Sequence, residues 1–153
     1  MITWTKISGV VVKGHGVASG QANDSRFPEG TIQMQKPAFS ERGLCLDAYF
    51  PGTLNISILP HSYAIQQSKY TFREVKWAAD RPAEDFSFFD CRILLNDKRI
   101  LEGLIYYPHP ETKPEHRQDA GTLEVLTAFI DGLRYGDTLV LEVNPKQIMI
   151  GGN

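Results

Sequence analysis

Short runs of β-branched and aromatic residues, each ended by glycine, proline or a polar turn, recur along most of this 153-residue chain. Residues 54–59 show the pattern most clearly, because apolar and polar side chains alternate between Pro51-Gly52 and Pro60. Further strands are expected at residues 7–13, 31–35, 69–77, 86–95, 99–107 and 138–143. Many short strands at close spacing predict a mainly β domain, either a small antiparallel barrel or a sandwich.

Two segments are candidates for short helices, and one polar break predicts a hairpin. Residues 37–48 begin with a proline, which suits the first turn of a helix. In residues 121–133, apolar side chains recur at helical spacing at Leu123, Leu126, Phe129 and Ile130. The run 125–129 within that segment also suits a strand, so both assignments stay open. Asn96-Asp97-Lys98 suits the turn of a hairpin between its two flanking strands.

Length, composition and charge exclude several classes of protein. With 42% hydrophobic residues and a net charge of −2, the chain does not have a disordered composition. Its apolar runs are only a few residues long, whereas a membrane-spanning helix needs about 20, so no membrane partner is expected. Nucleic acid is disfavoured because 18 acidic residues outnumber 16 basic ones. The length predicts a single domain over residues 1–153, with the oligomeric state left open.

The cysteines and the first residues indicate the compartment. Cys45 and Cys91 are 46 positions apart, with no CxxC pair and no histidine at metal-ligand spacing, which argues against a zinc site. Both adjoin apolar residues, so we expect two small buried hydrophobic side chains. Residues 1–6 lack the apolar core of a signal peptide, and a cytoplasmic location is the expectation.

A glycine-rich segment follows the first expected strand and is the first candidate binding site. Closely spaced glycines let the backbone bend and direct several N–H groups into one concavity, which suits a phosphate. The segment lacks the GK[ST] of a Walker loop, and a plain turn is the alternative. The candidate nucleotide-binding residues are Gly14, His15, Gly16, Val17, Ala18 and Ser19.

A second candidate site lies where residues 54–59 begin. Thr53 and Asn55 are two positions apart, so their side chains are expected on the same face of the strand. A hydroxyl and an amide oxygen are hard donors that suit a magnesium ion. Alternatively, threonine simply prefers strands, and asparagine beside a turn commonly bonds the backbone.

Ionisable residues in and after the polar loop 108–119 form the third candidate: His116, Asp119 and Glu124. Glu124 lies between Leu123 and Val125, so it is either the solvent-facing position of an amphipathic element or a group placed to take a proton. The residues alone favour the solvent-facing position. No G-x-S-x-G motif is present, and no arrangement of a nucleophile is apparent.

Taken in order, these segments resemble the archaeal CTP-dependent riboflavin kinases, a family of small cradle-loop barrels. Residues 9–16 resemble the family's G-x-V-x-S-G-x-G segment, and residues 51–56 resemble its G-T-L-N-L motif. Residues 123–126 resemble its I-E-I-I segment, and residues 133–140 resemble its closing L-x-x-G-D-x-V. Each motif alone is weak, but the ordered set spans roughly residues 7–143.

The resemblance implies a closed six-stranded barrel with one or two short helices that transfers a phosphoryl group from CTP to riboflavin, forming FMN. By position, the glycine segment would bind the nucleotide, and Thr53 and Asn55 would ligate Mg²⁺. Glu124 and His116 would lie in the flavin site, with Glu124 orienting or deprotonating the attacking hydroxyl. An aromatic residue such as Tyr106 would help to form a flat slot for the flavin.

The chain departs from the family at two nucleotide-contacting places. The family's loop continues G-x-G-E-G-R, whereas Val17-Ala18-Ser19 follows Gly16 here, so an acid and an arginine are missing. The segment between Ala128 and Gly136 is also about five residues shorter than in the family. The alternative function is therefore a non-catalytic flavin- or nucleotide-binding barrel. Retention of Thr53 and Asn55 favours the enzyme, because a mere barrel does not need that pair.

Overall fold

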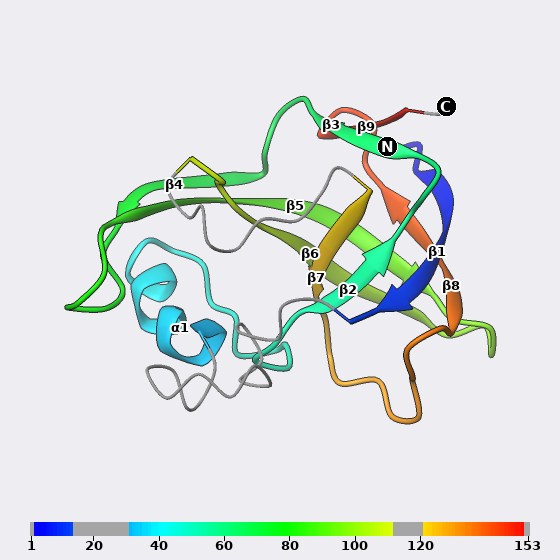
Figure 1. Cartoon of the computed structure of the whole chain (residues 1–153), viewed down its shortest axis with the longest axis horizontal. Helices are drawn as coiled ribbons and strands as arrows, with labels where there is room; N and C mark the ends of the chain where they lie inside the picture. The colour runs from blue at the N-terminus through cyan, green and yellow to red at the C-terminus, as the bar shows by residue number, and fades with distance from the viewer. Residues whose placement is uncertain (1, 14–30, 112–120, 152–153) are drawn as a thin grey trace.

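The computed structural model describes residues 2–13, 31–111 and 121–151, which form a mainly β architecture (Figure 1). One helix is defined in this part of the chain, α1 (Thr31–Glu41). The strands are β1 (Thr5–Val12), β2 (Leu54–Ser57), β3 (Ser62–Ile65), β4 (Tyr70–Val75), β5 (Glu84–Leu94), β6 (Ile100–Pro108), β7 (Thr122–Leu126), β8 (Thr138–Val143) and β9 (Ile148–Gly151). None of the described helical structure has the length and apolar character that crossing a membrane requires.

Six strands close into an antiparallel barrel, as predicted. Their order is β5-β6-β7-β2-β1-β8, and β8 pairs back with β5 to complete the circle. Closure removes the two free edges that an open sheet would expose. β4 pairs only with β5, outside the barrel, and β3 and β9 form a separate two-stranded sheet.

The long strands β5 and β6 extend beyond the barrel with β4 as an arm, and α1 packs on this arm (Figure 1). Alternate residues of β5 therefore contribute to two different cores. Phe89, Cys91 and Ile93 belong to the core of the barrel strands. Phe86 and Phe88 contact Phe39 of α1, with ring centroids 5.0 and 5.2 Å apart in edge-to-face arrangements. Because β5 is buried on both faces, one face of the sheet packs in the barrel core and the other packs against α1.

A glycine lets β6 and β7 approach closely. A side-chain carbon on Gly103 would lie 2.5 Å from the carbonyl oxygen of Leu126, too close for any residue other than glycine without a backbone shift. The close approach holds β7 against β6 where β7 ends, a few residues after Glu124.

The strand predicted at residues 31–35 is wrong, because these residues form the first half of α1. Its buried side chains are Thr31, Ile32, Gln35 and Phe39, a helical rather than an alternating spacing. The helix predicted at 37–48 is correct in type but misplaced, since α1 ends at Glu41 and Pro37 lies inside it. Pro37 and Gln33 are both exposed, so water can satisfy the carbonyl that the proline leaves without a donor.

For residues 121–133, the strand assignment holds for the first part, because β7 covers Thr122–Leu126 and no helix follows it. The hairpin at Asn96-Asp97-Lys98 is confirmed: Leu95 N–H donates to Arg99 O at 2.9 Å. Lys98 has φ 76°, the left-handed conformation common at the last position of a three-residue hairpin turn. The short strands β3 and β9 were not predicted.

The two cysteines differ in environment, so the prediction that both are buried is wrong for Cys45. Cys45 is exposed, whereas Cys91 is buried in the barrel, where burial raises the pKa of its thiol far above the usual value. We expect a disulfide reagent at neutral pH to modify one thiol in the native protein and two after denaturation. Cys45→Ala should abolish the native reaction. Rapid modification of two thiols without denaturant would contradict the buried position of Cys91.

Candidate functional site

Three polar side chains form a row across β2, β7 and β6. Asn55 is directly opposite Glu124, and Glu124 is directly opposite Tyr106. Residues directly opposite one another in neighbouring strands project from the same face of the sheet. Leu104 and Leu126 form a neighbouring pair on this face and pack in the core beneath α1. The row therefore lies on the side of the barrel wall that α1 covers.

Glu124 is buried in this row and bonded to Thr53. Its exposed fraction is 4%, so the solvent-facing position favoured from the sequence is wrong. Thr53 Oγ1 donates a hydrogen bond to Glu124 Oε1 at 3.1 Å, across 71 positions of sequence. A buried carboxylate is costly unless it is hydrogen-bonded, so this contact stabilises Glu124 and fixes its position.

The oxygen atoms at this place suit a magnesium ion. A threonine hydroxyl that donates its hydrogen keeps its oxygen lone pairs. Thr53 can therefore donate to Glu124 and ligate a cation at the same time. Asn55 and Thr53 are both half-buried, and Asn55 shares the face of Glu124. The described ranges contain no group of three or more His, Cys, Asp or Glu side chains that would indicate a zinc-type centre. One carboxylate with a hydroxyl and an amide instead fits Mg²⁺, which retains several waters.

Tyr106 lies at the other end of the row and is fully enclosed. Its hydroxyl donates to Gln35 Oε1 of α1 at 2.8 Å, and its exposed fraction is 2%. Burial, and next the charge of Glu124, raise the pKa of Tyr106 well above its usual range. A ring covered in this way cannot stack on a flavin, so Tyr106 does not help to form the predicted slot. Gln35 Nε2 is buried and has no hydrogen-bond partner within residues 2–13, 31–111 and 121–151.

Two of the predicted binding elements lie outside the described residues. These are the glycine segment with Gly14, His15, Gly16, Val17, Ala18 and Ser19, and the histidine His116. The strand that precedes the glycine segment is described. β1 ends at Val12, which is directly opposite Asn55, so the chain leaves β1 beside the candidate magnesium ligands.

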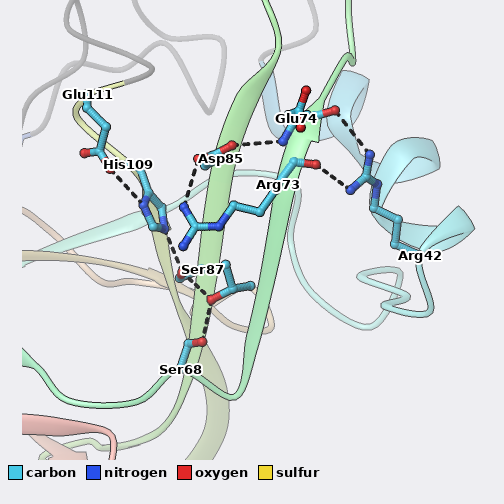
Figure 2. A network of polar contacts seen from close by, with 9 residues as sticks. Arg42, Ser68, Arg73, Glu74, Asp85, Ser87, His109 and Glu111 are labelled. Atoms are coloured by element: carbon cyan, nitrogen blue, oxygen red, sulfur yellow. Dashed lines mark hydrogen bonds and ion pairs between the residues drawn. The ribbon is translucent and has the colours of Figure 1, made fainter.

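A second polar network lies on the arm of the sheet, around His109 (Figure 2). His109 Nε2 is 2.7 Å from Ser87 Oγ, and His109 Nδ1 is 3.3 Å from Glu111 Oε2. Ser87 Oγ also forms a hydrogen bond with Thr71 Oγ1 at 2.8 Å. This network was not found from the sequence. The pairing of β5 with β6 was the available signal, because it brings His109 beside Asp85 and Ser87.

The order acid, imidazole, hydroxyl resembles that of a hydrolase, but Ser87 Oγ also bonds Thr71 Oγ1, so the hydroxyl is not the free end of the network. Ser87 is 3% exposed and lies within β5, where it pairs with Thr71 of β4 on one side and Tyr107 of β6 on the other. Its oxygen is held by Thr71 of β4 and by His109, which directly follows β6, so the hydroxyl links these strands. We therefore assign the network a structural role in joining β4, β5 and β6.

Charged residues extend the same network to α1 (Figure 2). Arg42 donates to the carbonyl oxygens of Arg73 at 2.8 Å and Glu74 at 3.3 Å, which ties the end of α1 to β4. Arg73 also pairs with Asp85 at 2.9 Å. A hydrogen bond from the Glu74 N–H, and then the contact with Arg73, hold the pKa of Asp85 below its usual value.

The structure thus brings together Thr53, Asn55 and Glu124, three of the residues proposed from sequence, at the start of β2. The side-chain oxygens of Thr53 and Asn55 can ligate a cation, and the neighbouring carboxylate of Glu124 can accept a proton. The sequence matches no protein-family model and no curated protein.

Proposed function

We propose that this chain is a Mg²⁺-dependent phosphotransferase that moves a phosphoryl group from a nucleoside triphosphate to riboflavin, forming FMN. The observation that carries the proposal is the hydrogen bond from Thr53 to Glu124, with Asn55 directly opposite the same carboxylate. It joins the segment that resembles G-T-L-N-L to the segment that resembles I-E-I-I. In the riboflavin kinases these two motifs carry the magnesium and flavin residues.

Each residue has a defined role in this reaction. Thr53 and Asn55 would hold Mg²⁺, which, when bound, neutralises charge on the phosphate oxygens. Glu124 would receive the proton of the primary hydroxyl of riboflavin as that oxygen bonds to the terminal phosphorus. The bond from this phosphorus to the bridging oxygen then breaks, and a nucleoside diphosphate leaves. The hydrogen bond from Thr53 keeps the carboxylate in one position while the proton moves.

The second candidate function is a barrel that binds a flavin or nucleotide without catalysis. The specific observation in its favour is Val17-Ala18-Ser19, which stands where the riboflavin kinases have an acid and an arginine. An arginine beside the phosphates would stabilise the charge that develops during transfer, so its absence lowers the expected rate rather than the expected binding.

Turnover with different donors separates the two candidates. Purified protein with riboflavin and Mg²⁺ is expected to form FMN with each of ATP, CTP, GTP and UTP, measured by chromatography. CTP should be preferred over ATP by less than about tenfold, or about 1.4 kcal/mol, because backbone N–H groups contact phosphates and do not read bases. An excess of EDTA should stop the reaction. Riboflavin binding without any FMN would favour the non-catalytic barrel, and binding of neither ligand would reject both functions.

A further inference from the structure

Two phenylalanine rings are exposed to solvent and contact each other. Phe50 is 44% exposed and Phe129 is 68% exposed. Their ring centroids are 5.4 Å apart, with an interplanar angle of 50°. Leaving two large apolar rings in water forgoes the free energy that burying them would give. Adjacent exposed aromatic residues of this kind indicate a surface that a ligand covers.

The pair is tied to the candidate site through the backbone. The N–H of Phe50 donates to the carbonyl oxygen of Thr127 at 2.9 Å, so the segments that carry the two rings lie side by side. Phe50 precedes Thr53 by three residues, and Phe129 follows Glu124 by five. The bond between Thr53 and Glu124 joins the same two segments. The two rings are therefore carried by the same two paired segments as Thr53 and Glu124.

We propose that Phe50 and Phe129 bind the isoalloxazine ring of riboflavin. This inference rests on the proposed function and assigns its ring-binding residues. In riboflavin only the short ribityl chain separates the ring from the reacting hydroxyl. In a nucleoside triphosphate, the sugar and two further phosphates separate the base from the terminal phosphorus. The counterpart of residues 128–136 in the riboflavin kinases contacts the nucleotide, but this segment is about five residues shorter here. An aromatic surface on the segments that carry Thr53 and Glu124 therefore suits the acceptor ring better than the base of the donor.

The chemistry of the two rings fits a flavin. Isoalloxazine is a flat fused system with a methylated, apolar benzene end, and phenylalanine offers an apolar ring face with no competing polar group. Thr127, in the same segment, is 6% exposed, and its hydroxyl has no hydrogen-bond partner in the described part of the chain. A carbonyl at the polar end of the flavin would accept a hydrogen bond from such a hydroxyl.

Binding of riboflavin to full-length variants tests this assignment. We expect Phe129→Ala to raise the Kd for riboflavin by at least about tenfold, because stacking on an aromatic ring is lost. Phe129→Trp should restore binding to within about threefold of the original protein, whereas Phe129→Leu should not, since it keeps apolar area without a ring. Affinity for ATP with Mg²⁺ should change by less than about twofold. Met149→Ala is the matched control, because Met149 is 54% exposed on the separate sheet of β3 and β9.

Each other outcome overturns the assignment. An unchanged Kd for riboflavin in Phe129→Ala would show that the rings do not contact the flavin. Weaker ATP binding with intact riboflavin binding would assign the pair to the base of the donor. Absence of riboflavin binding in the original protein would reject the proposed function as well, which distinguishes that failure from the first. Thermal unfolding of each variant checks that loss of binding is not loss of fold.

Discussion

Glu124→Gln is expected to lower the rate of FMN formation by at least about a hundredfold at saturating Mg²⁺, riboflavin and ATP. Glutamine preserves the size of the side chain and can still accept the hydrogen bond from Thr53 through its amide oxygen. It cannot accept a proton from the attacking hydroxyl, so catalysis is lost while binding of riboflavin is kept. The rate of FMN formation, with riboflavin affinity measured on the same preparation, separates these effects.

Glu142→Gln is the matched control for this variant. Glu142 is also a buried strand glutamate, 3% exposed, but it lies in β8 and pairs with Arg92 at 2.6 Å. Removing its charge should lower the free energy of unfolding by about 1–3 kcal/mol and leave the activity of the folded protein unchanged. The account fails for Glu124 if its glutamine variant is likewise less stable but fully active.

Asn55→Ala is expected to raise the Mg²⁺ concentration needed for half-maximal activity by about 10–100-fold. The substitution removes one of the two proposed oxygen ligands, so the ion and the triphosphate both bind more weakly. The free energy of unfolding should change by less than about 1 kcal/mol, because Asn55 is only half-buried. A titration of activity against Mg²⁺ at fixed ATP gives the shift.

Ser57→Ala controls for position on the strand. Ser57 is also half-buried in β2 and, two residues after Asn55, projects from the same face. It lies opposite Thr122 rather than Glu124, so its loss should leave the Mg²⁺ dependence unchanged. If instead Asn55→Ala unfolds the protein and the folded fraction keeps its Mg²⁺ dependence, Asn55 has a structural role.

Local sequence patterns were sufficient for most of the barrel. Residues 138–143 were predicted to form a strand and coincide with β8, because Thr-Leu-Val-Leu-Glu-Val follows a clear turn signal. Residues 31–35 were misassigned because Ile32 and Met34 alternate over too short a window. The helix there is decided by the burial of Ile32, Gln35 and Phe39 against the arm of the sheet, which is a tertiary effect.

The candidate site was only partly predictable for the same reason. Alternation in Leu123-Glu124-Val125 correctly places Glu124 on the face opposite the barrel core, and an uncovered face would be exposed to water. Nothing in the local pattern shows that α1 covers this face. The contact between Thr53 and Glu124 spans 71 positions and follows from the pairing of β2 with β7, which spacing along the chain does not reveal. The His109 network lies on the hairpin of β5 and β6, which was predicted, but the polar side chains that meet there depend on the strand register and were not identified.

The position of the bound metal ion tests the central claim most directly. Crystals of the protein with riboflavin, a non-hydrolysable ATP analogue and Mn²⁺ in place of Mg²⁺ would locate the ion by its anomalous scattering. The proposed site predicts a peak about 2 Å from Thr53 Oγ1 and from the side-chain oxygen of Asn55, next to the carboxylate of Glu124. A metal ion and triphosphate bound away from the start of β2 would contradict the account.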